Sequence, residues 1–393
     1  MAKKRILLIW WELDHRPELL QPFIDMSDEL EFIQLIYKNK EERTTSCSPF
    51  KMIYWFDYVN AKAILKDIKP SAIVGTSESI FIATLINSAR KAGIPFYGLQ
   101  HGITTENISE LLVDPRTFSW KKVATYIKST TFFFCSFSIF NFKKFCSAAY
   151  FFRLYPKYFF QQILTDHHFP WATPQYYVCF SEYASEHYKE MYHLKDEQVK
   201  YIGIIWFDKL FKNFTKQGMQ TKATGEKYYL LIDTCFKDYH KPITSEQTNR
   251  CYKTLSDFCE EKGARLLVKL HPWNYENKNL IQHPNIEYVR KVDDDALHAL
   301  IRNCEGCFSF YSTLILPVLA FTPVVQIEYD GIYLKPAKEK GLTPVIDFYS
   351  FEKSDIHFPS KEMEEQGKKS LEYLLYKTDG NAVKRLEAIL LAT

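Results

Sequence analysis

The chain has 393 residues, of which 46% are hydrophobic and 25% charged, as in an ordinary globular protein. This length exceeds what one core usually holds, so two domains of roughly 150 to 200 residues are expected. A net charge of only +3 argues against a nucleic-acid-binding protein, and we expect no nucleic-acid partner.

The first predicted element is a buried strand near the start of the chain. Its apolar run, from Ile6 to Trp11, is six residues long and stops before Glu12. That is too short for the core of a signal peptide, and no later apolar window is long enough to cross a bilayer, so we expect a cytoplasmic protein. Strand-like and helical stretches then alternate, which implies a parallel sheet with helices on both faces. The strands are expected in 30–37, 71–77 and 94–100, and the helices near 59–68 and 79–92.

Residues 116–165 interrupt this pattern. They include eight basic residues, seventeen aromatic residues and no acidic residue. One interpretation is a helical insertion whose aromatic side chains fill the core of the first domain. Another is a basic, aromatic face that lies on an anionic membrane. A nucleic-acid stacking groove is a weaker third interpretation.

A polar segment, 211–227, with two glycines and no apolar periodicity predicts a linker. A second series of strands and helices follows it, and an amphipathic helical segment, 368–393, comes last. Strands are expected in 227–234, 264–272, 306–312 and 323–329, and helices in 248–263 and 293–304. The expected division is a first domain over 1–211, a linker over 212–227, a second domain over 228–360 and C-terminal helices over 361–393.

Ligands of doubly wound sheets bind at the carboxyl ends of the strands, so polar residues that follow strands are the candidates. Neither GxGxxG nor GxxxxGK[ST] is present, which disfavours dinucleotide oxidoreductases and P-loop ATPases. The candidates in the first domain are Glu12, Asp14 and His15, the stretch 75–79, and Gln100, His101 and Gly102. Those in the second domain are Lys269, His271, Pro272, Ser309, Ser312 and Thr313.

A phosphate site is the interpretation that we favour for the second domain. Pro317 predicts a helix that starts near Leu316, because proline is tolerated in the first turn of a helix. The hydroxyls at the strand-to-helix junction then either cap the helix or face an anion. The motif KLHP, which we place on the neighbouring strand, favours the anion, because the His271 imidazole can donate a hydrogen bond to a phosphate.

No metal site and no cofactor are expected. The acidic run 293–295 precedes a helical stretch and is typical of a helix cap. Cys304 and Cys307 form a CxxC pair with no second pair at matching spacing, so we predict buried thiols rather than a zinc site.

Taken together, these motifs resemble those of a known enzyme fold. Two α/β units in series, KLHP in the second, and SFYSTLILPVLAFTPVVQIEYD about forty residues later resemble the nucleotide-binding half of GT-B glycosyltransferases. The pattern is similar to that of bacterial sialyltransferases and Kdo transferases, which carry a His-Pro motif and a serine motif. It is also similar to that of the CDP-glycerol glycerophosphotransferases, whose WHG motif resembles QHG at 100–102.

The resemblance implies two Rossmann-like domains that face each other across a cleft. It implies a metal-independent transferase of bacterial capsule, lipopolysaccharide or other surface-polysaccharide synthesis, with a CMP-activated or other nucleotide sugar as donor and a lipid-linked or oligosaccharide acceptor. His271, Pro272 and Lys269 would contact the donor phosphate, and the hydroxyls of Ser309, Ser312 and Thr313 would hold phosphate or ribose.

The resemblance also implies roles on the acceptor side. His101 would take the proton from an acceptor hydroxyl, which suits the ordinary pKa of imidazole. Gln100 and Gly102 would lie beside it, and Glu12, Asp14 and His15 are alternative bases.

Three alternatives stay open. The first is a transferase that moves a polyol phosphate from a CDP-polyol with the same two histidines. The second is an enzyme like UDP-N-acetylglucosamine 2-epimerase. Pro317, however, stands where many UDP- and GDP-sugar enzymes of this fold carry a ribose-binding glutamate. The third is a non-catalytic protein on a GT-B scaffold.

Overall fold

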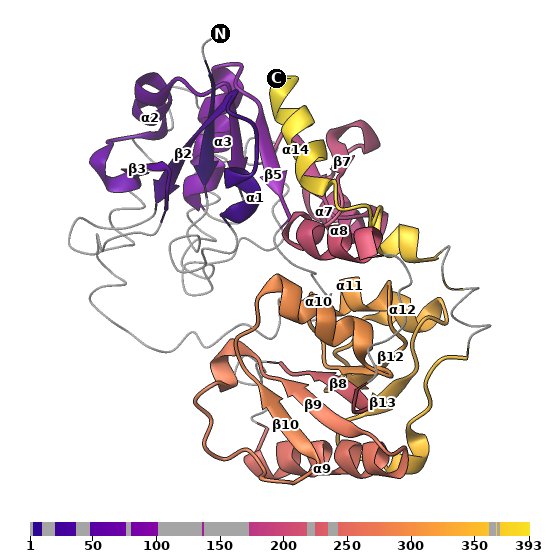
Figure 1. Cartoon of the computed structure of the whole chain (residues 1–393). Helices are drawn as coiled ribbons and strands as arrows, with labels where there is room; N and C mark the ends of the chain where they lie inside the picture. Colours follow the sequence, from indigo (N-terminus) through magenta and orange to yellow (C-terminus); the bar gives the residue numbers. More distant parts are fainter. Residues whose placement is uncertain are drawn as a thin grey trace.

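The computed structural model holds two parallel sheets, each with helices packed against it (Figure 1). It describes residues 3–9, 20–36, 48–75, 80–100, 136, 173–217, 225–234, 243–360, 367 and 370–393. The two α/β units in series that the alternating pattern predicts are therefore confirmed.

The first sheet has seven described strands, all paired in parallel, in the order β3-β2-β1-β4-β5-β6-β7. The chain starts in the middle of this sheet, runs outward to β3 and then returns past β1 to β4. The strands are β1 (Lys4–Ile9), β2 (Leu30–Ile36), β3 (Lys51–Tyr54), β4 (Ala72–Gly75), β5 (Phe96–Leu99), β6 (Tyr176–Cys179) and β7 (Val199–Tyr201).

The second sheet repeats this topology with six described strands, in the order β10-β9-β8-β11-β12-β13. All its pairs are parallel as well. Both sheets thus have the doubly wound order in which the first strand lies between the second and the fourth. The strands are β8 (Tyr228–Ile232), β9 (Arg265–Lys269), β10 (Ile286–Val289), β11 (Cys307–Ser309), β12 (Val324–Glu328) and β13 (Val345–Asp347).

Helices cover both faces of each sheet. In the first unit, α2 and α3 bury their apolar sides on one face, and α1 and the last helix, α14, do so on the other. In the second unit, α9 covers one face, and α10, α11 and α12 cover the other. The helices are α1 (Gln21–Ile24), α2 (Ala61–Ile68), α3 (Ile80–Lys91), α7 (Glu182–Tyr192), α8 (Asp208–Gln217), α9 (Ser245–Glu261), α10 (Asp294–Asn303), α11 (Ile315–Leu319), α12 (Lys335–Glu339) and α14 (Ala382–Leu391). Short 3-10 turns are η3 (Trp55–Asp57), η4 (Asp196–Gln198), η5 (Ile205–Phe207), η7 (Pro272–Asn274) and η8 (Lys353–Asp355).

The last helix returns to the first unit, as Figure 1 shows in yellow. Leu386 and Leu390 of α14 are buried in the core cluster that contains Ile6 and Leu8 of β1. The carboxylate of Asp208, at the start of α8, accepts hydrogen bonds from the backbone N–H groups of Ala382 and Val383 at 2.9 and 2.8 Å. This carboxylate satisfies two of the free amides at the start of α14 and fixes that helix to α8.

The helix α8 also contacts the second unit. The Phe214 ring stacks on Phe321 with centroids 3.5 Å apart and meets the His298 ring of α10 edge-on at 4.2 Å. Asn213 donates a hydrogen bond to Asp295 at 2.8 Å. Residues 212–217, which were expected to belong to a linker, are helical. The apolar surface against which Phe214 packs stabilises this last part of α8.

Two further expectations bear on the membrane. Of the insertion 116–165 the structure describes Ser136 alone, so all three interpretations of that segment fall outside the described residues. The Ser136 hydroxyl accepts a hydrogen bond from the backbone N–H of Ala61 at the start of α2, at 3.0 Å. Within the described part of the chain, no helix is both long and apolar enough to cross a membrane.

Candidate functional site

The carboxyl ends of β8, β9 and β11 bring together the polar residues that the sequence analysis selected in the second unit. The strand β8 lies between β9 and β11, so the connections that leave β8 and β11 diverge to opposite faces of the sheet. This is the switch point at which open α/β sheets bind ligands. The sequence analysis placed the KLHP strand next to the serine strand. That was wrong, because the first strand of a doubly wound unit occupies the centre.

The turn after β9 begins at His271 and is hydrogen-bonded to Asp233. Asp233 directly follows β8 and is only 2% exposed. Its carboxylate accepts hydrogen bonds from the backbone N–H of His271 at 3.0 Å and from the side chain of Asn274 at 2.7 Å. Pro272 starts the 3-10 turn η7, which the hydrogen bond from Asn274 N to the His271 carbonyl closes at 2.8 Å. The position of the His-Pro motif is thus fixed by a residue on the neighbouring strand.

Lys269, the last residue of β9, brings a positive charge to the same edge. Its side chain shares a face of the sheet with Leu267, which packs on the α10–α12 side, and it is partly buried. Burial lowers the pKa of the Lys269 ammonium, and the nearby Asp233 carboxylate opposes that shift. No carboxylate among the described residues forms an ion pair with Lys269. A buried cation without an ion pair is costly, so this place favours an anionic ligand.

The serine loop after β11 is bonded largely to itself. Ser309 is 1% exposed, and its hydroxyl donates to the carbonyl oxygen of Phe310 at 2.7 Å. The Ser312 hydroxyl accepts from the backbone N–H of Leu314 at 3.3 Å, and the Thr313 carbonyl accepts from Leu316 N. The helix α11 starts at Ile315, so the start predicted from Pro317 is confirmed within a residue. Ser312 therefore bonds to the turn that precedes α11, and the N-cap residue of that helix, Leu314, has no side-chain cap.

Thr234, next to Asp233, connects the two loops across β8. Its carbonyl oxygen accepts a hydrogen bond from the Asn274 side chain at 3.1 Å, and its hydroxyl donates to the carbonyl oxygen of Tyr311 at 3.3 Å. The His271 turn and the serine loop are therefore two sides of one hydrogen-bonded edge.

In the first unit, part of the corresponding edge is described. Gln100 follows β5, is fully buried, and accepts a hydrogen bond from the backbone N–H of Phe180 at 2.8 Å. Its amide thereby extends the pairing of β5 with β6. Gly98 lies against the Tyr177 ring, 2.5 Å from where a Cβ atom would stand, so no larger residue fits there. The candidates Glu12, Asp14, His15, His101 and Gly102 lie outside the described residues.

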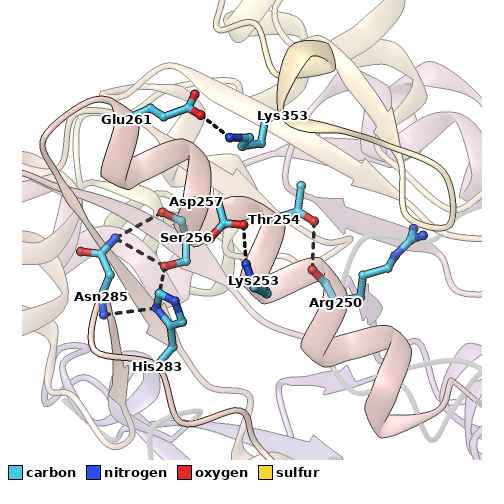
Figure 2. Close-up of polar contacts among 9 residues, drawn as sticks. All are labelled: Arg250, Lys253, Thr254, Ser256, Asp257, Glu261, His283, Asn285 and Lys353. Atoms are coloured by element: carbon cyan, nitrogen blue, oxygen red, sulfur yellow. Dashed lines mark hydrogen bonds and ion pairs between the residues drawn. The ribbon is translucent and has the colours of Figure 1, made fainter.

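A second histidine lies at the opposite, amino-terminal edge of the second sheet, beside Ser256 of α9 (Figure 2). This histidine is His283. Its Nδ1 atom accepts a hydrogen bond from the backbone N–H of Asn285 at 3.3 Å and lies 3.3 Å from the Ser256 hydroxyl. The Asn285 side chain donates to the carbonyl oxygens of Ser256 and Ala264, both at 3.2 Å. Ser256 is fully buried, so this cluster fastens a loop to α9 and offers no nucleophile.

The remaining polar candidates have structural roles. Asp293 caps α10 through a hydrogen bond from Ala296 N at 2.8 Å, as expected. Cys304 and Cys307 are buried free thiols. Across the described ranges, no group of three or more His, Cys, Asp or Glu side chains is arranged to hold a metal ion.

Asp233 is the site residue that the sequence analysis missed. The signal was present, because YYLLID is a buried strand that ends in an acid. A carboxylate directly after the first strand of a doubly wound unit lies at the switch point, whatever glycine motif is present or absent.

No family model matches this sequence, and no curated protein matches it. Solved structures do match its fold over nearly the whole chain. The calicheamicin glycosyltransferase CalG4 is 13% identical, with a TM-score of 0.56 over 100% of this chain and 98% of its own. A variant of the wall teichoic acid polymerase TagF is 11% identical, with a TM-score of 0.52 over 99% of this chain and 88% of its own. The UDP-GlcNAc 2-epimerase of Neisseria meningitidis, solved with UDP-GlcNAc, is 12% identical, with a TM-score of 0.50 over 99% of this chain and 100% of its own. At these identities the likeness concerns the fold, which is GT-B.

Proposed function

We propose that the chain is a glycosyltransferase of bacterial surface-polysaccharide synthesis. It transfers a sugar from a nucleotide-activated donor to a lipid-linked or oligosaccharide acceptor. One observation carries the proposal: Lys269, which has no ion pair among the described residues, lies with the fixed His271 turn and the serine loop along the carboxyl edge of the second sheet. Neighbours of the same fold support it by analogy, since one is a glycosyltransferase and another is an epimerase bound to UDP-GlcNAc.

The chemistry needs positive charge and hydrogen-bond donors where the donor phosphate leaves. Glycosyl transfer breaks the bond between the anomeric carbon and a phosphate oxygen, and the nucleotide departs with the bonding electrons. In the proposed mechanism, Lys269 and His271 stabilise that charge, a contribution on the order of 3 kcal/mol per donor. His101 takes the proton of the acceptor hydroxyl as the new bond forms. No metal and no cofactor are part of this proposal.

A thermal-shift panel of CMP, CDP, UDP and GDP identifies the donor nucleotide, since a ligand that binds the folded state raises the Tm. The donor is then labelled with radioactive phosphorus next to the transferred group and incubated with lipid-linked oligosaccharides from bacterial membranes. We expect the label to stay with the released nucleotide.

The other outcomes each name a different function. Label in the acceptor product would indicate transfer of a polyol phosphate from a CDP-polyol. A donor sugar of changed configuration without an acceptor product would indicate an epimerase. Failure of all four nucleotides to raise the Tm would leave a non-catalytic GT-B scaffold.

The proposed location is the cytoplasm, with peripheral contact to the inner face of the membrane through residues 116–165. Eight cations and no acid in that segment motivate the membrane contact. The intact protein should co-sediment with anionic vesicles at low salt, should be released as salt rises, and should ignore neutral vesicles. If the protein does not co-sediment with anionic vesicles at low salt, the membrane proposal is wrong, and the glycosyltransferase proposal is unaffected.

A further inference from the structure

We propose that Asp233 is the positioning residue of this site, holding both ends of the His271–Asn274 turn where the turn can meet the donor phosphate. The inference rests on the proposed function, because it concerns how the same phosphate-binding edge is organised.

The carboxylate of Asp233 accepts hydrogen bonds from the first and the last residue of the turn. One oxygen, Oδ2, accepts from the backbone N–H of His271 at 3.0 Å and from Asn274 Nδ2 at 2.7 Å. The backbone N–H of Asp233 donates to the carbonyl oxygen of Lys269 at 3.1 Å, so β8 and β9 remain paired up to the turn. The turn therefore cannot move relative to β8 without breaking these bonds.

The other carboxylate oxygen is fastened to the core. Oδ1 accepts from the hydroxyl of Tyr252 at 2.8 Å, and Tyr252 lies in α9 with no exposed surface. The backbone N–H of Thr234 also donates to the Asp233 carboxylate. Four hydrogen-bond donors thus face this carboxylate. They lower its pKa and oppose burial, the largest effect, which raises it.

The position of Asp233 is that of a support and not of a ligand. Its side chain points to the α9 face, whereas Lys269 lies on the α10–α12 face. At 2% exposure under the turn, the carboxylate has no surface to offer a substrate. An anion is also a poor contact for a phosphate, so Asp233 acts through His271 and Asn274.

The chain offers a matched pair of asparagines for the test. Asn274 donates two side-chain hydrogen bonds at the carboxyl edge of the sheet, to Asp233 and to the Thr234 carbonyl. At the amino edge, the Asn285 side chain donates to the carbonyl oxygens of Ser256 and Ala264, both at 3.2 Å, and to the Ser256 hydroxyl at 3.4 Å. Figure 2 draws the two contacts with Ser256. Replacing either with alanine removes similar bonds, but only Asn274 belongs to the proposed site.

The experiment compares the unaltered protein with Asp233→Ala, Asp233→Asn, Asn274→Ala and Asn285→Ala. Two quantities are measured: hydrogen exchange of the His271 amide, and calorimetric affinity for the nucleotide that the thermal-shift panel selects. Asp233→Asn is the rescue variant. It keeps one oxygen for His271 and Asn274 and turns its amide to the Tyr252 hydroxyl, which can accept.

Asp233→Ala should speed exchange of the His271 amide at least ~10-fold and weaken nucleotide affinity at least ~10-fold, a loss equal to about one good hydrogen bond. Asn274→Ala should weaken affinity at least ~3-fold. Asp233→Asn and Asn285→Ala should bind within ~3-fold of the unaltered protein, and Asn285→Ala should nevertheless have a lower Tm.

Two results would overturn the positioning role. One is an unchanged exchange rate and affinity in Asp233→Ala. The other is an equal loss of affinity in Asn274→Ala and Asn285→Ala. That result would mean that both substitutions act by destabilising the fold and not through the site. If Asp233→Ala does not fold, the nucleotide affinities of Asn274→Ala and Asn285→Ala decide whether the turn is part of the binding site. If the unaltered protein binds no nucleotide, the proposed function fails, and hydrogen exchange still decides whether Asp233 holds the turn.

Discussion

Asp233 accepts a hydrogen bond from the backbone N–H of His271 at 3.0 Å, and this contact joins the carboxyl ends of β8 and β9. The two residues are 38 positions apart in the chain. Their contact makes the His-Pro turn part of the sheet instead of a free loop. This rigidity matters for the proposed function, because a phosphate is bound well only by donors that are held in place beforehand.

The Lys269 ammonium should make nucleotide binding depend on pH. Burial lowers the pKa of this group. A lysine binds a phosphate as the cation, so affinity should fall as pH rises through the lowered pKa, at a lower pH than for an exposed lysine. Calorimetric titrations across the alkaline range measure this fall.

Two variants separate the charge of Lys269 from its bulk. Lys269→Arg stays protonated throughout, so its affinity should lose the alkaline fall. Lys269→Met should bind weakly at every pH. An alkaline fall that survives in Lys269→Met would assign the titration to another group.

The contact of Asp208 with the start of α14 should contribute measurably to stability. Its carboxylate is 5% exposed and accepts from Ala382 N and Val383 N. Asp208→Ala leaves both amides without that partner and should lower the free energy of unfolding by ~1–2 kcal/mol, as the loss of a helix cap does. Lys209→Ala, next to it, removes exposed ion pairs to Asp294 and Asp295 at 3.9 and 3.6 Å and should change little. Equal Tm values for the two variants would show that Asp208 does not hold α14.

Two buried glutamines should respond in opposite directions to the same substitution. Within the described ranges, neither side-chain polar atom of Gln34 in β2 has a hydrogen-bond partner, although the residue is fully buried. Gln34→Met should therefore raise stability by ~1 kcal/mol, because it removes an uncompensated desolvation cost. In β12, Gln326 donates to Thr343 at 2.6 Å and accepts from Leu334 N at 2.7 Å. Gln326→Met should lower stability by ~1–3 kcal/mol. Denaturant unfolding compares them, and a destabilised Gln34→Met would mean that the Gln34 amide has a partner.

The repeated strand–helix pattern sufficed to predict both α/β units, because strongly apolar strands and long amphipathic helices dominate them. The elements that it missed are short. The edge strands β3, β10 and β13 have three or four residues each and are partly exposed, so little apolar periodicity marks them. Their positions follow from pairing with a neighbour and not from their own composition.

The candidate residues of the second unit can be selected from the sequence, but their arrangement cannot. KLHP and the serine loop stand out because polar residues follow apolar strands, yet their separation by β8 depends on the strand order. The sequence shows Asp233 as an acid that ends a buried strand but does not show its role, because that role comes from contacts with Tyr252 and Asn274, which are distant in sequence. The hydroxyl of Ser309, a residue expected to hold phosphate or ribose, donates to the carbonyl oxygen of Phe310.

The most direct test of the central claim is a calorimetric titration with CMP, CDP, UDP and GDP of the unaltered protein, His271→Ala and His283→Ala. The two histidines lie at opposite edges of the same sheet, and His283 serves as the control for the loss of an imidazole. We expect one nucleotide to bind the unaltered protein and His283→Ala with equal affinity and to bind His271→Ala at least ~10-fold more weakly. Equal affinity in all three proteins would contradict a phosphate site at the carboxyl edge of the second sheet.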